Sequence, residues 1–134
     1  MSLIHNPQDL SIQAQDFITA FAEAGPDFLE AHIPESFVVG IISGASVVER
    51  SRFIHMALQR AALVAGLRLA PPTISAVQVS EVGPGYLLAT ATWTMTLTND
   101  EVATLVEDFL IDRTQPQWQC LAYLLRQDLP ALLA

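Results

Sequence analysis

Residues 86–98 read Tyr-Leu-Leu-Ala-Thr-Ala-Thr-Trp-Thr-Met-Thr-Leu-Thr, and this stretch decides the fold class. From position 89 onward an apolar residue at each odd position alternates with a threonine at each even position. Successive side chains of a strand point to opposite faces of a sheet, so the alternation predicts a strand with one apolar face and one threonine face. Because the threonine face avoids charge, we expect it to meet a partner.

Three further strands are predicted around this one. They cover about residues 73–82, 101–113 and 118–127, and turn-forming residues separate them: Pro71-Pro72, Gly83-Pro84-Gly85, Asn99-Asp100 and Thr114–Gln117. Proline and glycine clusters between β-branched and aromatic runs are typical of strand ends. The second half of the chain therefore predicts a four-stranded antiparallel meander.

The first half has helical periodicity. Asn6 and Pro7 begin a helix whose apolar stripe ends at Gly25-Pro26. A short helix at 27–32, a buried strand at 36–43 and a longer helix follow, the last capped by Ser46 with Glu49 at the capping-box position. Helices followed by a meander predict one α+β domain over residues 1–134, with its core in about 8–130 and its helices on one face of a curved sheet.

The composition excludes several classes of function. The chain has 134 residues, six arginines, no lysine and a formal net charge of −8. Nucleic acids and anionic membranes are therefore not expected partners, since both are bound by clustered basic residues. No apolar stretch is long enough to span a membrane, and the first residues lack the pattern of a secretory signal. Together with a single cysteine, Cys120, which is expected in the core, this predicts a cytoplasmic protein.

Four segments carry a resemblance to a known superfamily: Ala22–Leu29, His32–Val39, Gly44 with Val47–Ala57, and Asp108–Cys120. Their order resembles the nuclear transport factor 2-like superfamily, the cystatin-like α+β cone that includes SnoaL-like and ketosteroid-isomerase-like proteins. The resemblance implies a pocket between the helices and the concave face of the sheet, and a homodimer formed by the outer faces. It does not imply one reaction, because isomerases, dehydratases, cyclases and transport factors share this fold.

One departure from the superfamily bears on the reaction. Ketosteroid isomerases carry an aspartate base on the strand that follows the second helix, and Gly40 stands at that place here. The ketosteroid-isomerase mechanism is therefore not expected.

Strand register decides which side chains line the implied pocket. If the Asn99-Asp100 turn is an even-numbered loop, Leu97 pairs with Val102, and Asp108 lies on the face that carries Trp93 and Tyr123. The inward set is then Trp93, Met95, Val106, Asp108, Leu110, Leu121 and Tyr123. Asp108 would act as acid or base and Tyr123 as hydrogen-bond donor, because a carboxylate in an apolar wall suits proton transfer. Two alternatives remain: the two residues form a structural pair, or a register shift of one residue turns Glu107 inward and Asp108 outward.

The remaining candidates come from the helices. His32 borders the implied pocket and is a second candidate acid or base, and the alternatives are a helix-terminal cap or a surface histidine. Phe17 and Phe21 are either ligand contacts or core residues. The three histidines show no metal-ligand spacing, and neither a metal nor another cofactor is expected.

Together these observations predict a SnoaL-like protein that binds a small apolar or amphipathic molecule. They leave open whether it is also a proton-transfer enzyme, such as an isomerase, a dehydratase or a cyclase. The alternative is a non-catalytic binding or assembly module whose cone is filled by its own side chains.

Overall fold

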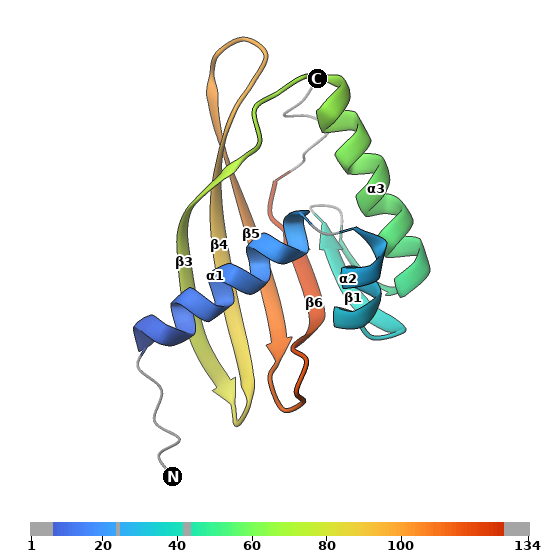
Figure 1. Cartoon of the computed structure of the whole chain (residues 1–134), viewed down its shortest axis with the longest axis vertical. Helices are drawn as coiled ribbons and strands as arrows, with labels where there is room; N and C mark the ends of the chain where they lie inside the picture. The colour runs from blue at the N-terminus through green and yellow to red at the C-terminus, as the bar shows by residue number, and fades with distance from the viewer. Residues whose placement is uncertain (1–6, 24, 42–43, 128–134) are drawn as a thin grey trace.

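The computed structural model describes residues 7–23, 25–41 and 44–127, which form three helices and one six-stranded sheet (Figure 1). The helices are α1 (Pro7–Glu23), α2 (Pro26–His32) and α3 (Arg50–Gly66). The strands are β1 (Ser36–Ile41), β2 (Gly44–Glu49), β3 (Thr73–Gly83), β4 (Tyr86–Thr96), β5 (Val102–Asp112) and β6 (Gln119–Leu125). The predicted α+β architecture is confirmed. Asn6, the predicted cap of α1, and residues 42 and 43 of the first predicted strand lie outside the described residues.

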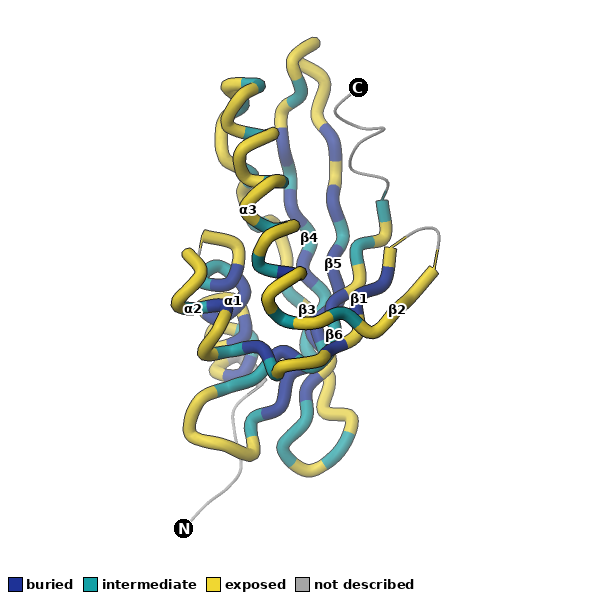
Figure 2. Tube along the Cα trace, turned by 90° about the vertical axis from the view of Figure 1, so that its right-hand side faces the viewer, coloured by how far each residue is buried: buried dark blue, intermediate teal, exposed yellow. Residues whose placement is uncertain are grey.

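The sheet has the order β2-β1-β6-β5-β4-β3. The strands β3 to β6 form the predicted meander, in which each strand pairs antiparallel with the next. The hairpin of β1 and β2 joins the meander through a parallel pairing of β1 with β6. All three helices lie on one side of the sheet, and α1 crosses the strands of the meander (Figures 1 and 2).

The core lies between this side of the sheet and the helices. Alternate residues of the central strands point inward, and most are apolar: Leu87, Ala89, Ala91, Trp93 and Met95 from β4, and Ala103, Leu105, Phe109 and Ile111 from β5. The apolar stripe of α1 packs against them, with Ala14 and Ile18 fully buried. The C-terminal half of α3 is largely exposed (Figure 2), so this helix covers the upper part of the sheet only loosely.

The predicted start of the third helix is wrong. Residues 46–49 belong to β2, which pairs with β1 so that Val47 lies opposite Val38 and Val48 opposite Phe37. Both valines are β-branched and favour a strand, and the hairpin overrides the local capping pattern. Glu49, rather than Ser46, stands at the N-cap position of α3, and within the described residues its side chain makes no capping hydrogen bond. The chain is held there by the Arg50 side chain, which donates to the carbonyl oxygens of Glu30 and Ile33.

The loop between β4 and β5 is one residue shorter than predicted. Leu97 N donates to Glu101 O at 2.8 Å, so the loop consists of the three residues 98–100, and Asp100 adopts the left-handed conformation (φ 65°). A three-residue loop that ends in a left-handed residue is a common hairpin connection. Val102 therefore pairs with Thr96 rather than with Leu97. This shift reverses the faces of β5 relative to β4, so the predicted register is wrong.

A β-bulge in β6 produces a second shift. Ile111 pairs with Cys120 but Leu110 pairs with Ala122, so Leu121 is an extra residue in β6. Beyond the bulge Tyr123 lies opposite Phe109 instead of Asp108. Tyr123 thus stays on the inner face, as predicted, and its neighbours there are the odd-numbered residues of β5.

Among the described helices, none combines the length and the apolar character that a membrane-spanning segment needs.

Candidate functional site

Three polar side chains meet on the inner face of the sheet. The Tyr123 hydroxyl donates a hydrogen bond to Glu107 Oε2, and Arg60 Nη1 donates to the same hydroxyl oxygen at 2.9 Å. Arg60 Nη1 also lies 3.6 Å from Glu107 Oε2. Glu107 and Tyr123 are each only 5% exposed. The three side chains form a hydrogen-bond network in which the Arg60 guanidinium on α3 donates to the Tyr123 phenol on β6, and the phenol donates to the Glu107 carboxylate on β5.

Each member of this network is positioned by a regular element. Glu107 occupies one place in the inward row of β5, between Leu105 and Phe109. Tyr123 lies opposite Phe109 and therefore diagonally next to Glu107, a spacing that long side chains bridge. Arg60 lies three residues after Ala57 and four before Val64, both half-buried, so its guanidinium is brought to the inner face by helical periodicity.

Burial and the neighbouring charges fix the protonation of the phenol. Burial, reinforced by the charge of Glu107, raises the pKa of Tyr123 well above its ordinary value. Burial opposes the charged form of Arg60, but Tyr123 and Glu107 outweigh this effect and hold the pKa of Arg60 above its usual value. Tyr123 therefore remains a protonated donor at neutral pH, and Arg60 remains a cation.

Aromatic rings surround the Tyr123 end of the network. Phe21 stacks on Tyr123 with ring centroids 6.2 Å apart, and Phe53 and Phe109 meet its ring edge-on at 5.9 and 5.3 Å. Phe17 continues the cluster from Phe21 toward α2. Phe17 and Phe21 thus lie in the core, as one of the two sequence interpretations has it, and Phe21 also touches a member of the network.

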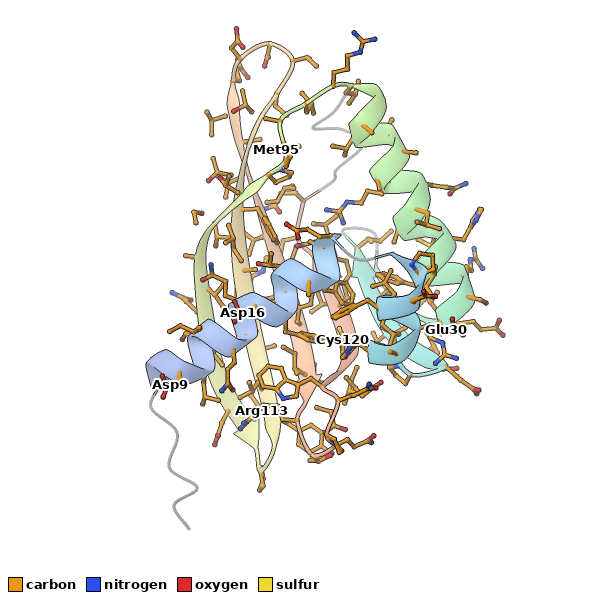
Figure 3. All side chains as sticks on the ribbon, viewed as in Figure 1. Asp9, Asp16, Glu30, Met95, Arg113 and Cys120 are labelled. Atoms are coloured by element: carbon orange, nitrogen blue, oxygen red, sulfur yellow. The ribbon has the colours of Figure 1, made fainter. Side chains whose placement is uncertain are left out.

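The strand β4 supplies the inward-facing residues on the other side of β5. Trp93 lies opposite Leu105 and diagonally next to Glu107, and Met95 lies opposite Ala103. Figure 3 shows Met95 high in the sheet, at the level of the C-terminal half of α3. The indole Nε1 of Trp93 is buried and has no hydrogen-bond partner among the residues that the structure describes.

Asp108 does not face Tyr123, because the two register shifts turn it to the outer face of the sheet. There Arg126 binds its carboxylate through Nε at 2.8 Å and Nη2 at 2.9 Å, and the Thr90 hydroxyl donates to it at 2.7 Å. The hydrogen bonds from Arg126 outweigh desolvation and, together with Thr90, lower the pKa of Asp108. Val106 and Leu110 share this outer face, and Leu121 is the extra residue of the bulge. The predicted pairing of Asp108 with Tyr123 is therefore wrong.

His32 is held in a different part of the core. Its Nδ1 lies 2.7 Å from the carbonyl oxygen of Trp118, and its ring stacks on Phe28 with centroids 4.1 Å apart. Phe17 contacts the ring of His32, and Phe17 and Phe21 lead from there to Tyr123. The structure thus joins His32 to the β5–β6 hairpin and does not bring it together with Glu107 and Tyr123.

The sequence left one member of the network as an open alternative and gave no prediction for another. Glu107 was the alternative to Asp108 as the inward-facing carboxylate, and the length of the β4–β5 loop decides between these two residues. Arg60 was missed, although a signal exists. It lies seven residues after Phe53 and four before Val64, where an inward-facing apolar residue is the rule. A charged residue on the inner stripe of a helix is informative because charges are rarely buried without a partner.

One cleft among the described residues lies away from this network. It has a volume of about 480 Å³ and lies between α2 and the start of α3, where Glu30, Glu35 and Glu49 line it together with Arg50. Its acidic side chains are exposed, in contrast to the buried carboxylate of Glu107.

Comparisons with known proteins bear on the fold. No protein-family model matches the chain, and no curated protein matches its sequence. Among solved structures, an NTF2-like (nuclear transport factor 2-like) protein from Cytophaga hutchinsonii superposes with a TM-score of 0.64 at 13% identity, covering 92% of this chain and 100% of that one. Aln2 from a Streptomyces species gives 0.64 at 14% identity over 98% of both chains.

A third similar structure is an uncharacterised protein with a cystatin-like fold from Caulobacter vibrioides. Its TM-score is 0.63 at 16% identity, covering 94% of this chain and 93% of that one. At such identities the likeness shows the fold and not the activity. The predicted resemblance is confirmed: this chain has the nuclear transport factor 2-like, cystatin-like α+β fold.

Proposed function

We propose that this chain binds a small apolar organic molecule against the inner face of its sheet, and that Glu107 transfers a proton to or from that molecule. The observation that carries the proposal is the buried network of Arg60, Tyr123 and Glu107. Burying a carboxylate costs free energy, and well-packed apolar residues in its place would often stabilise a fold at least as well. Ionisable groups retained in a core at such a cost are typical of functional sites.

The three side chains take different roles in this proposal. Glu107 Oε2 is occupied by the Tyr123 hydroxyl, whereas Oε1 has no hydrogen-bond partner among the described residues and is the atom that exchanges the proton. Tyr123 stays protonated and orients the carboxylate. Arg60, with its side chain 39% exposed, balances the charge of Glu107 from the α3 side.

The apolar surroundings define the class of ligand. Trp93 and Leu105 lie next to Glu107 on the inner face, and Met95 is the next inward residue of β4 beyond Trp93. All three are apolar over most of their surface. A mostly apolar wall with a few convergent polar groups is the usual composition of a small-molecule site. An uncharged or weakly polar organic molecule therefore suits this face better than a phosphate or a sugar.

Hydrogen exchange on a simple carbon acid tests the proposal. The probe is 2-tetralone in D₂O, and deuterium incorporation next to its carbonyl group is followed by NMR. We expect the chain to accelerate the exchange over buffer, and Glu107→Gln to reduce the acceleration by about 10²- to 10⁴-fold, the usual contribution of a general base. Asp108→Asn, the matched change on the neighbouring residue, should retain it. Loss in Asp108→Asn with full activity in Glu107→Gln would overturn the assignment.

A non-catalytic module is the second candidate, and one observation favours it. Phe21, Phe53, Phe109 and Tyr123 pack against one another and fill the part of the inner face below Glu107. On this alternative the three side chains of the network only stabilise the fold, and the upper part of the inner face is closed as well. Absence of any exchange, together with no change in melting temperature on addition of 2-tetralone, would favour the module.

A homodimer through the outer face of the sheet belongs to the same proposal. An apolar row crosses five strands there, formed by Val47, Val38, Ala122, Leu110 and Leu88 in consecutive pairs. Val47 is 72% exposed and Leu88 40% exposed. The two carboxylates that flank this row on β5, Asp108 and Asp112, both accept hydrogen bonds from neighbouring side chains. Two copies of a chain of net charge −8 can therefore meet on this face with little unpaired charge between them.

A further inference from the structure

The indole of Trp93 carries a hydrogen-bond donor that the described fold does not use. Trp93 is 8% exposed, and its Nε1 is buried without a partner among the described residues. Buried indole N–H groups almost always find an acceptor, because the group has lost its bonds to water. Leaving one unpaired inside a core destabilises the fold, which makes the orphaned donor of Trp93 an observation that needs a cause.

The donor lies on the same face as the Glu107 network. Trp93 pairs with Leu105 on one side and with Ile74 on the other. Glu107 is the next inward residue of β5 after Leu105, so Trp93 and Glu107 are diagonal neighbours, about 7–8 Å apart in an antiparallel sheet. A small organic molecule bound on this part of the inner face would therefore contact both the indole and the carboxylate.

Trp93 also lies outside the aromatic cluster around Tyr123. The ring contacts of that cluster join Phe17, Phe21, Phe53, Phe109 and Tyr123, and Trp93 takes part in none of the aromatic contacts among the described residues. The half of α3 that extends past Arg60 is largely exposed and covers this part of the sheet loosely. The indole packs in the core without a second aromatic ring of the described residues beside it, so the ring of a bound molecule would be its first aromatic neighbour.

From these observations we infer that Trp93 is a specificity-determining residue whose Nε1–H binds an uncharged oxygen acceptor, such as a carbonyl oxygen, on the ligand of the proposed site. The inference rests on the proposed function. An indole is a donor only, so it selects molecules that present an acceptor and gives nothing to a hydrocarbon of the same shape. The acceptor is an uncharged one, because the indole brings no positive charge with which to bind an anion. The negative field of the chain also disfavours anions.

Two probes of the same shape test the inference. They are 2-acetylnaphthalene and 2-isopropenylnaphthalene, in which a methylene group replaces the carbonyl oxygen. The chain has two tryptophans, so Trp118→Phe provides a background in which the fluorescence of Trp93 alone reports binding. We expect the ketone to bind about 2- to 10-fold more tightly than the hydrocarbon, the usual net effect of one hydrogen bond.

Removal of the N–H group should abolish the difference between the probes. Trp93→Phe is the first variant, with binding followed by calorimetry. Replacement of Trp93 by benzothienylalanine, which keeps the bicyclic shape, is the second and guards against a folding defect. In both, the two probes should bind equally. Equal binding to the wild type, or a preference that survives in both variants, would overturn the role of Trp93 and leave the site intact. If neither probe binds the wild type, the proposed function fails and the inference fails with it.

Discussion

Glu107 and Asp108 are neighbours in the chain, yet their carboxylates lie on opposite faces of the sheet, one bound by Tyr123 and the other by Arg126. The inner carboxylate is shielded from water among aromatic rings, whereas the outer one is covered by an exposed arginine. Replacing the carboxylate by an amide is therefore expected to have different effects on stability and activity at Glu107 and at Asp108.

The inner carboxylate is coupled to the phenol. Tyr123→Phe should lower the free energy of unfolding by about 1–3 kcal/mol, because it leaves buried Glu107 without a donor. In Glu107→Leu the hydroxyl has lost its acceptor, so Tyr123→Phe should then cost less. A double-mutant cycle measured by urea unfolding should give a coupling of at least about 0.5 kcal/mol. Strictly additive effects would contradict the network.

The cation of the network should depend on Glu107. Glu107→Gln preserves an acceptor for Tyr123 but leaves Arg60 without its counter-charge. Because Arg60 is partly exposed, we expect a moderate loss of about 1–2 kcal/mol in the free energy of unfolding. Adding Arg60→Met to this variant should recover part of the loss, since the uncompensated charge is then gone. Thermal unfolding of Glu107→Gln and of the double variant measures this difference in stability.

The outer carboxylate should give an acid-dependent stability. Arg126 and Thr90 lower the pKa of Asp108 in the folded chain, so the unfolded chain binds its proton more readily. The stabilisation is complete at neutral pH and is lost as the pH falls below about 4, through the pKa of the folded state. The difference in unfolding free energy between wild type and Asp108→Asn should therefore shrink over this range. A difference that stays constant down to pH 2 would argue against the Arg126 contact.

The thiol of Cys120 should be inert in the folded chain. Cys120 is fully buried, and this burial raises its pKa to about 12. At pH 8 we expect Ellman's reagent to label it at least about 100-fold more slowly than in urea, because both the thiolate fraction and access are reduced. Labelling at the rate of an exposed thiol in the native chain would mean that β6 opens readily.

The outer face should govern self-association. Val38→Asp places a charge in the apolar row, and light scattering after gel filtration should then report a monomer where the wild type is a dimer. Ile12→Asp is the matched control, because Ile12 is an exposed apolar residue on α1, on the helical side of the molecule. A monomeric wild type, or dissociation in both variants, would contradict the proposed interface.

The sequence predicts most of this fold because period and turn signals agree over long segments. The alternation of residues 89–98 and the proline- and glycine-rich boundaries establish the meander, and the apolar stripe of α1 establishes the helical layer. The short strand β2 was missed because Ser46 and Glu49 imitate a helix cap, and only pairing with β1 decides between the two. Long-range pairing of this kind leaves no local signal.

The candidate site was less predictable, for a geometric reason. One residue in the β4–β5 loop and one in the β6 bulge each reverse the faces of a strand relative to its neighbour. Tyr123 and Trp93 were placed on the inner face, but the carboxylate between them changed from Asp108 to Glu107. The left-handed conformation of Asp100, which distinguishes a three-residue loop from an even one, is not evident from an Asn-Asp pair.

The parallel pairing of β1 with β6 has a consequence for the order in which the chain folds. β2 pairs with one edge of β1 locally, but the other edge of β1 is paired only by β6, and the hydrogen bond that ties His32 to Trp118 joins residues 86 positions apart. During synthesis the first half of the chain therefore leaves the ribosome before the strand that completes its core exists. Closing so long a loop is slow, and until β6 is made Phe17 and Phe21 of α1 lack their ring contacts with Trp118 and Tyr123. Truncation before residue 119 should thus release a chain that aggregates, rather than a stable N-terminal subdomain.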